Sequence, residues 1–169
     1  MHITTDLGRL HVQASGSGTP IVFWPSLLMD GSMWSAQQAH FADRYQVVLV
    51  DPPGHGRSEP LTDLFTFDEC AHCVTQILDG IGAERAHFVG NSWGGMIGGT
   101  LAAHYPSRVI SAVLMNCTGS PAPRPVAETK AMADAIPGAR FGVLAETAHL
   151  AGLENPDEVN ALIDEFLGG

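Results

Sequence analysis

A serine lies between two glycines in the stretch GNSWG at 90–94, directly after the apolar run at 86–89. The spacing G-x-S-x-G is typical of a sharp turn that joins a strand to a helix and exposes the serine as a nucleophile. Glycine costs backbone entropy, so the pair indicates a turn without room for side chains. Ser92 could then attack a carbonyl carbon, and the Trp93 N–H would bind the resulting oxyanion. The alternative is a glycine-rich packing turn.

A serine nucleophile needs a base, and the chain has 8 histidines. His149 is the candidate because it follows a predicted strand at 140–144, and active residues gather at the carboxyl ends of parallel strands. It also follows the serine in chain order, as this type of turn expects. His55 has glycine and proline neighbours that indicate a structural turn, and His87 is expected inside a strand as a core residue. The remaining histidines are expected to be solvated: His2, His11, His40, His72 and His104.

The elements that position these residues alternate between short apolar runs and amphipathic segments, which predicts an α/β fold with a mostly parallel sheet. The expected strands are a hairpin of 2–5 with 10–14 and the runs 21–24, 47–50, 86–89, 112–115 and 140–144. The expected helices are 34–43, the segment after a capping box at Thr66, 93–104, 127–136 and a C-terminal segment containing Val159, Leu162 and Ile163.

Composition and charge exclude several classes of protein. The 169 residues are 45% hydrophobic and 15% charged, which is typical of a globular chain with one core. The net charge of -10, with only 8 Lys+Arg, argues against a nucleic-acid partner. No apolar run approaches the length of a membrane span, and the N-terminus lacks a secretory pattern. Three cysteines fit a reducing cytoplasm, where we expect the protein to reside.

Cys70 and Cys73 form a C-x-x-C pair, a pattern that can bind metal or carry out redox chemistry. Both lie on the apolar stripe of the helix predicted after Thr66, and no second pair completes a zinc site. We therefore expect core residues and no metal site.

Three motifs together resemble the α/β-hydrolase superfamily: DPPGHGRS at 51–58, GNSWGG at 90–95 and AHLAGLENPDEVNALIDEFL at 148–167. They are most similar to the small esterases, enol-lactonases and cofactor-free haloperoxidases, and they occur in the family's order over nearly the whole chain. The resemblance implies that Ser92 is the nucleophile and His149 the base, with no metal or organic cofactor.

The resemblance also implies a second oxyanion donor in the segment WPSLLMDGSMW at 24–34. Pro25 and Ser26 stand where the family usually has His and Gly. The backbone N–H of Leu27 would then be the donor, beside that of Trp93.

The chain departs from the family after the strand at 112–115, where a helical cap and a strand bearing the acidic triad member normally follow. Met115 reaches Pro125 in ten residues, which is too few for both, and Ser120 stands where the aspartate is expected. We therefore expect a shortened fold without a cap domain. Apolar surface left uncovered in this way predicts a homodimer, with or without exchanged segments.

Three explanations of the missing acid remain open. It is relocated, with Asn116, Glu128 or Glu146 as the group that orients His149; an amide orients a histidine but does not stabilise the imidazolium as a carboxylate does. Alternatively, a natural or engineered deletion leaves a Ser–His dyad, or the chain is a catalytically dead remnant.

We expect one minimal domain over 1–169, with a deletion junction near 116–125, that acts on small carboxylic esters or lactones through an acyl-enzyme on Ser92. The alternative is a catalytically impaired or non-catalytic α/β-hydrolase-like domain, including an engineered minimal scaffold. A haloperoxidase or perhydrolase activity would use the same residues. We expect a small-molecule partner and neither nucleic acid nor membrane.

Overall fold

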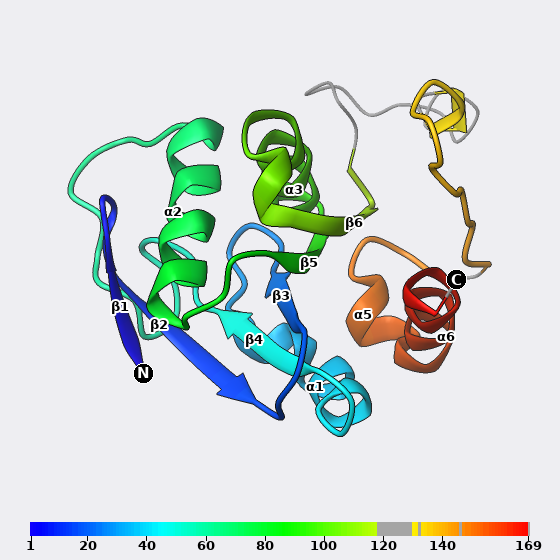
Figure 1. Cartoon of the computed structure of the whole chain (residues 1–169), viewed down its shortest axis with the longest axis horizontal. Coiled ribbons are helices and arrows are strands. Elements are labelled where there is room, and N and C mark those ends of the chain that lie inside the picture. The colour runs from blue at the N-terminus through cyan, green and yellow to red at the C-terminus, as the bar shows by residue number, and fades with distance from the viewer. Residues whose placement is uncertain (118–129, 132, 146, 169) are drawn as a thin grey trace.

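A mixed sheet runs through the centre of the computed structural model, which describes residues 1–117, 130–131, 133–145 and 147–168 (Figure 1). Among these residues the sheet has six strands in the order β1-β2-β4-β3-β5-β6. The strands are β1 His2–Thr5, β2 Gly8–Ser15, β3 Pro20–Trp24, β4 Gln46–Val50, β5 Ala86–Asn91 and β6 Val109–Met115.

Strands β4, β3, β5 and β6 are parallel, whereas the hairpin β1–β2 joins the sheet antiparallel to β4. Trp24 on β3 is paired with Gly90 on β5, and Asn91 is paired with Met115 on β6. The carboxyl ends of three neighbouring strands therefore meet at one edge, where ligands bind in open parallel sheets. The predicted fold class is confirmed.

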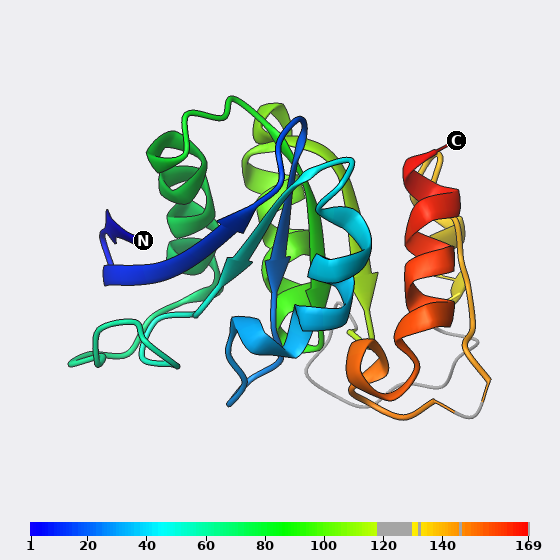
Figure 2. The same ribbon diagram turned by 90° about the horizontal axis from the view of Figure 1, so that it is seen from below.

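Helices cover both faces of the sheet (Figure 2). One face carries α2 Phe67–Gly80 and α3 Trp93–His104, and the other carries η1 Gly31–Trp34, α1 Ser35–Phe41, α5 Ala151–Glu154 and α6 Pro156–Leu167. A short η2, Pro106–Arg108, precedes β6. In the described part of the chain, no helix combines the length and apolarity that crossing a membrane requires.

Alternate side chains of each central strand enter different cores, because successive residues of a strand point to opposite faces. Val22 and Trp24 pack toward α2 and α3, whereas Ile21 and Phe23 pack toward α1 and α6. The capping box at Thr66 is present at the start of α2.

The C-x-x-C pair lies in the core on α2, as predicted. Cys70 and Cys73 are both buried and free. Desolvation by burial raises the pKa of both thiols, so neither is poised to react as a thiolate.

The predicted strand at 140–144 is wrong, since these residues form no strand. The segment lies along α6 instead: the Arg140 guanidinium pairs with Glu165, and Gly142 lies beside Leu162. A strand needs a hydrogen-bonded neighbour, and an apolar run alone does not provide one. The helix predicted over 127–136 lies partly outside the described residues. Within its described part, residues 130, 131, 133 and 134 are helical.

Strand β6 is the most exposed of the four parallel strands, with Ile110 39% and Leu114 36% exposed. Apolar surface of this kind is what the predicted homodimer would bury. The dimer itself stays a prediction, and the proposed junction near 116–125 lies outside the described residues except for 116 and 117.

Helix α6 holds the C-terminal part of the chain, including the loop with His149, against α1. Val159 and Ile163 are each 1% exposed, and the Asp164 carboxylate pairs with Arg44 at 2.8 Å and His40 at 2.6 Å. Burial of these two apolar side chains supplies the main attraction, because exposed ion pairs contribute little.

Replacing Ile163 with Ala should lower the free energy of unfolding by about 2 to 5 kcal/mol, since it leaves a cavity under α6. Leu162→Ala is the matched control, because Leu162 is 39% exposed and should cost about 1 kcal/mol or less. Urea unfolding followed by circular dichroism measures both. Equal losses would contradict this packing of α6.

Candidate active site

The predicted turn is present, and it places Ser92 between the end of β5 and the start of α3. Ser92 has φ 55° and ψ −116°, a conformation that costs energy for a residue with a side chain. Its N–H donates to the Met115 carbonyl at 2.8 Å, which ties the turn to the end of β6. The side chain is half-buried at the N-terminus of α3, where the helix dipole favours negative charge.

The glycines of the motif are explained by close backbone approach. A Cβ on Gly90 would lie 2.2 Å from the Gly94 carbonyl oxygen, and a Cβ on Gly94 would lie 2.4 Å from the Trp24 carbonyl oxygen. A Cβ on Gly95 would lie 2.6 Å from Cys117 Sγ. These separations are far below van der Waals contact, so larger residues would force the strands and α3 apart.

The two predicted oxyanion donors lie on neighbouring segments. Trp93 begins α3, so its N–H has no partner within the helix, and Leu27 lies in an exposed turn closed by Met29 N–H donating to the Ser26 carbonyl. Among the described residues neither donor N–H has an acceptor. The turn is joined to the elbow by Asn91 Nδ2, which donates to the buried Ser26 Oγ at 2.6 Å.

His55 supports the same turn, which extends its predicted structural role. Its Nδ1–H donates to the Pro53 carbonyl at 2.9 Å, so Nε2 is free to accept the Leu28 N–H at 3.2 Å. The ring also packs on Trp93 with centroids 5.7 Å apart. Leu28 has φ 65°, and this hydrogen bond helps to hold the strained residue beside the donor segment.

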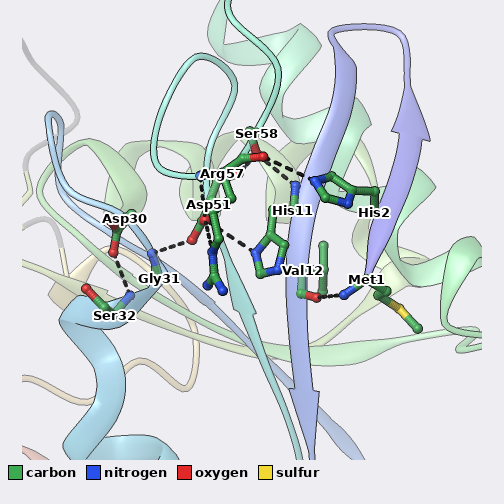
Figure 3. Close-up of polar contacts among 10 residues, drawn as sticks. All are labelled: Met1, His2, His11, Val12, Asp30, Gly31, Ser32, Asp51, Arg57 and Ser58. Carbon is green, nitrogen blue, oxygen red and sulfur yellow. Dashed lines mark hydrogen bonds and ion pairs between the residues drawn. The ribbon is translucent and has the colours of Figure 1, made fainter.

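A buried carboxylate at the end of β4 anchors the loops behind the site (Figure 3). Asp51 is 2% exposed and accepts the backbone N–H groups of Gly31 at 3.0 Å and Arg57 at 2.9 Å. Ser58 Oγ donates to the Asp51 carbonyl at 2.6 Å and accepts the His11 N–H at 2.8 Å. These bonds fix the segment that leads from Leu27 to α1 relative to the loop that carries His55.

His11 was expected in solvent, and the structure shows it buried beside Asp51. Its side chain is 11% exposed, and Nδ1 lies 3.3 Å from Asp51 Oδ2 without hydrogen-bond geometry. Desolvation by burial and the charge of Arg57 lower the pKa of His11, while Asp51 opposes them. His87 lies in β5, the strand predicted for it, but it is half-buried rather than in the core; its Nδ1 lies 2.8 Å from Ser111 Oγ, and burial lowers its pKa.

The loop before α5 brings His149 to the elbow by its backbone. The His149 carbonyl accepts from Asn91 Nδ2 at 2.8 Å and from Asn116 Nδ2 at 3.0 Å, and Asn91 is the residue before Ser92. The side chain of His149 is exposed, and no hydrogen bond joins its imidazole to the Ser92 hydroxyl. The structure therefore brings the two residues to one edge of the sheet, and their chemical roles stay predictions.

The candidates for the acid have different outcomes. The Asn116 amide contacts the carbonyl of His149 rather than its ring, so its role in the place of the triad acid stays a prediction. Glu128, Glu146 and Ser120 lie outside the described residues. The identity of the acid stays open.

Sequence reasoning missed two residues that shape this site. Asn91 is fully buried and uses its whole amide, because Oδ1 also accepts from Asn116 Nδ2 at 2.9 Å. Glu154 binds the backbone on both sides of His149. The motif allows any residue at Asn91, so only its place directly before the serine could have marked it.

Similarity to known proteins is consistent with this geometry. A family model described as the alpha/beta hydrolase fold matches residues 19–149. The chain belongs to the α/β-hydrolase family.

Individual α/β-hydrolases are similar to between 63% and 99% of the chain. The putative carbamate hydrolase RutD of Azorhizobium caulinodans is 36% identical over 107 residues, which cover 63% of this chain and 40% of that protein. The enol-lactonase structure from Burkholderia xenovorans LB400 is 30% identical with a TM-score of 0.67, covering 69% of this chain and 46% of that one. A thermophilic esterase from Thermogutta terrifontis, at 18% identity and a TM-score of 0.92, covers 99% of this chain and 97% of that one and supports the fold alone. The chain spans less than half the length of the curated relatives it matches.

Replacing Gly94 with Ala should destabilise the fold by about 1 to 3 kcal/mol, because the new methyl group collides with the backbone of β3. Gly99→Ala in the same helix is the matched control, since a Cβ there meets only Leu114 Cδ1 at 3.8 Å. That change should stabilise the fold by up to about 1 kcal/mol through helix propensity. Thermal unfolding distinguishes the two, and a stable Gly94→Ala variant would argue against the tight turn.

Stability should fall as the pH drops below about 6.5, the usual pKa of histidine. The lowered pKa of His11 means that the unfolded chain binds a proton more readily than the native state, so acid favours unfolding. The urea midpoint should decline between about pH 7.5 and about pH 5.5, the range in which histidine titrates. His11→Gln should make this decline shallower, because the variant lacks the histidine that takes up the proton. Identical declines in wild type and His11→Gln would contradict the assignment.

Proposed function

We propose that the chain is a serine hydrolase that cleaves small carboxylic esters or lactones through an acyl-enzyme on Ser92, with His149 as general base. The observation that carries the proposal is the strained turn, which holds the Ser92 hydroxyl at the N-terminus of α3. Similarity to an enol-lactonase and to a putative carbamate hydrolase supports hydrolysis at a carbonyl carbon as the reaction class.

In the first half-reaction, Ser92 Oγ attacks the substrate carbonyl while His149 accepts the serine proton. The N–H groups of Trp93 and Leu27 hold the oxyanion of the tetrahedral intermediate. The intermediate collapses when the C–O bond to the alcohol breaks and His149 gives its proton to the leaving oxygen. With a lactone, that alcohol stays attached to the acyl chain.

In the second half-reaction, His149 takes a proton from water, and the resulting hydroxide attacks the acyl-enzyme. The attack forms a second tetrahedral intermediate. Its collapse breaks the bond between the acyl carbon and Ser92 Oγ, and the serine recovers its proton from His149. The carboxylic acid leaves, and no metal or organic cofactor enters either step. The rate depends on what orients His149, because replacing the triad's Asp by an amide cost about 10⁴-fold in a protease.

A second candidate is a catalytically impaired or non-catalytic domain of the same fold. It is favoured by the absence of a hydrogen bond between the Ser92 hydroxyl and the His149 ring in the described part of the chain. Catalytic hydrogen bonds are often loose before substrate binds, so the reactivity of Ser92 separates the two functions.

The deciding experiment is intact-protein mass spectrometry after incubation with a fluorophosphonate, which phosphonylates an activated serine. We expect a single adduct that disappears in Ser92→Ala and persists in Ser107→Ala, an exposed serine in η2. An unlabelled, folded wild-type protein would favour the non-catalytic domain instead.

A further inference from the structure

The carboxylate of Glu154 binds the backbone of the loop that carries His149, the proposed base. Glu154 Oε2 accepts the Ala148 N–H at 2.8 Å, and Glu154 Oε1 accepts the Leu150 N–H at 2.9 Å. These are the amides on either side of His149, and each carboxylate oxygen takes one of them. Hydrogen bonds to an ionised acceptor are stronger than neutral ones, and two together fix orientation as well as distance.

Two amides bind the same loop at its carbonyl of residue 149. Asn91 and Asn116 both donate to the carbonyl of His149, and Asn91 is itself fixed in the core. Three side chains thus bind the backbone at 148–150, whereas the imidazole has no hydrogen bond to another described side chain. In this part of the molecule, the ring is positioned through its backbone.

We propose that Glu154 is a positioning residue for His149: by binding the two flanking amides, it fixes the peptide from which the imidazole reaches Ser92. The inference rests on the proposed function. The side chain of His149 is exposed, whereas Leu150 and Ala151 pack against the core, so packing holds the loop after His149 but not the imidazole itself. A general base that must lie within hydrogen-bond reach of a serine loses rate when its backbone is free to move.

A simpler role for Glu154 is to cap the first turn of α5, which begins at Ala151. A cap of this kind contributes to stability but has no reason to change the chemistry on Ser92. The two roles therefore differ in what they predict for the rate at unchanged stability.

The test compares Glu154→Ala and Glu154→Gln with Glu158→Ala in the full chain. Glu158 is an exposed carboxylate on α6 that accepts from Asn155 Nδ2 at 2.5 Å and does not bind the His149 loop. The measurements are the rate of Ser92 phosphonylation by a fluorophosphonate, kcat and KM for p-nitrophenyl acetate, and the thermal midpoint.

We expect Glu154→Ala to slow phosphonylation and kcat by about 10-fold or more, with KM changed by less than about 2-fold. Glu154→Gln should fall between Glu154→Ala and wild type, because its amide keeps one acceptor oxygen. Glu158→Ala should remain within about 2-fold of wild type. Amide hydrogen exchange at Ala148 and Leu150 should accelerate in Glu154→Ala while that in α6 stays unchanged.

The proposal is overturned if Glu154→Ala is labelled at the wild-type rate, or if its loss of rate is matched by Glu158→Ala. It is also overturned if kcat follows the thermal midpoint across all three variants, since a cap alone then explains the data. If Glu154→Ala does not fold, Glu154→Gln carries the same comparison. A wild-type protein without a Ser92 adduct would refute the proposed function first, and this inference with it.

Discussion

The site depends on how closely the turn after β5 approaches the backbones of β3 and α3. At Gly90 and Gly94 there is no space for even one carbon atom, so the strand must turn abruptly and α3 must begin at once. This constraint leaves Ser92 in a strained conformation, half-exposed, with the positive end of a helix behind it. The surrounding sheet offsets the energetic cost of this strained backbone. Strain of this kind is common at functional sites.

The buried amide of Asn91 transmits this arrangement to the segments on both sides. It donates to Ser26, the residue before the predicted oxyanion donor Leu27, and to the carbonyl of His149. Its Oδ1 accepts from Asn116. A buried amide costs free energy unless it is fully hydrogen-bonded, so this network specifies one arrangement of three loops. A single side chain thus joins the nucleophile turn to the oxyanion segment and to the loop of the proposed base.

Local patterns predicted the parts of this molecule that local constraints decide. The glycines around Ser92, the alternating strands and the capping box at Thr66 each follow from steric or hydrogen-bonding needs within a few residues. The run at 140–144 has the composition of a strand, but pairing depends on a neighbouring edge that composition does not reveal.

Some of the contacts that sequence reasoning missed join distant parts of the chain, although those of Glu154 span only 4 and 6 positions. Asn91 and His149 are 58 positions apart, and the contact between His11 and Asp51 joins β2 to the end of β4. Side-chain identity shows that such residues can donate, accept or ionise, but only the folded chain selects the partner.

A double-mutant cycle on ester hydrolysis tests most directly whether Ser92 and His149 act as one catalytic unit. The rates of Ser92→Ala, His149→Ala and the double variant would be compared with wild type on one activated ester. Because members of one catalytic unit lose activity non-additively, the account predicts that all three variants fall to the same residual rate. Additive losses, with the double variant slower than either single variant by the product of their effects, would contradict it.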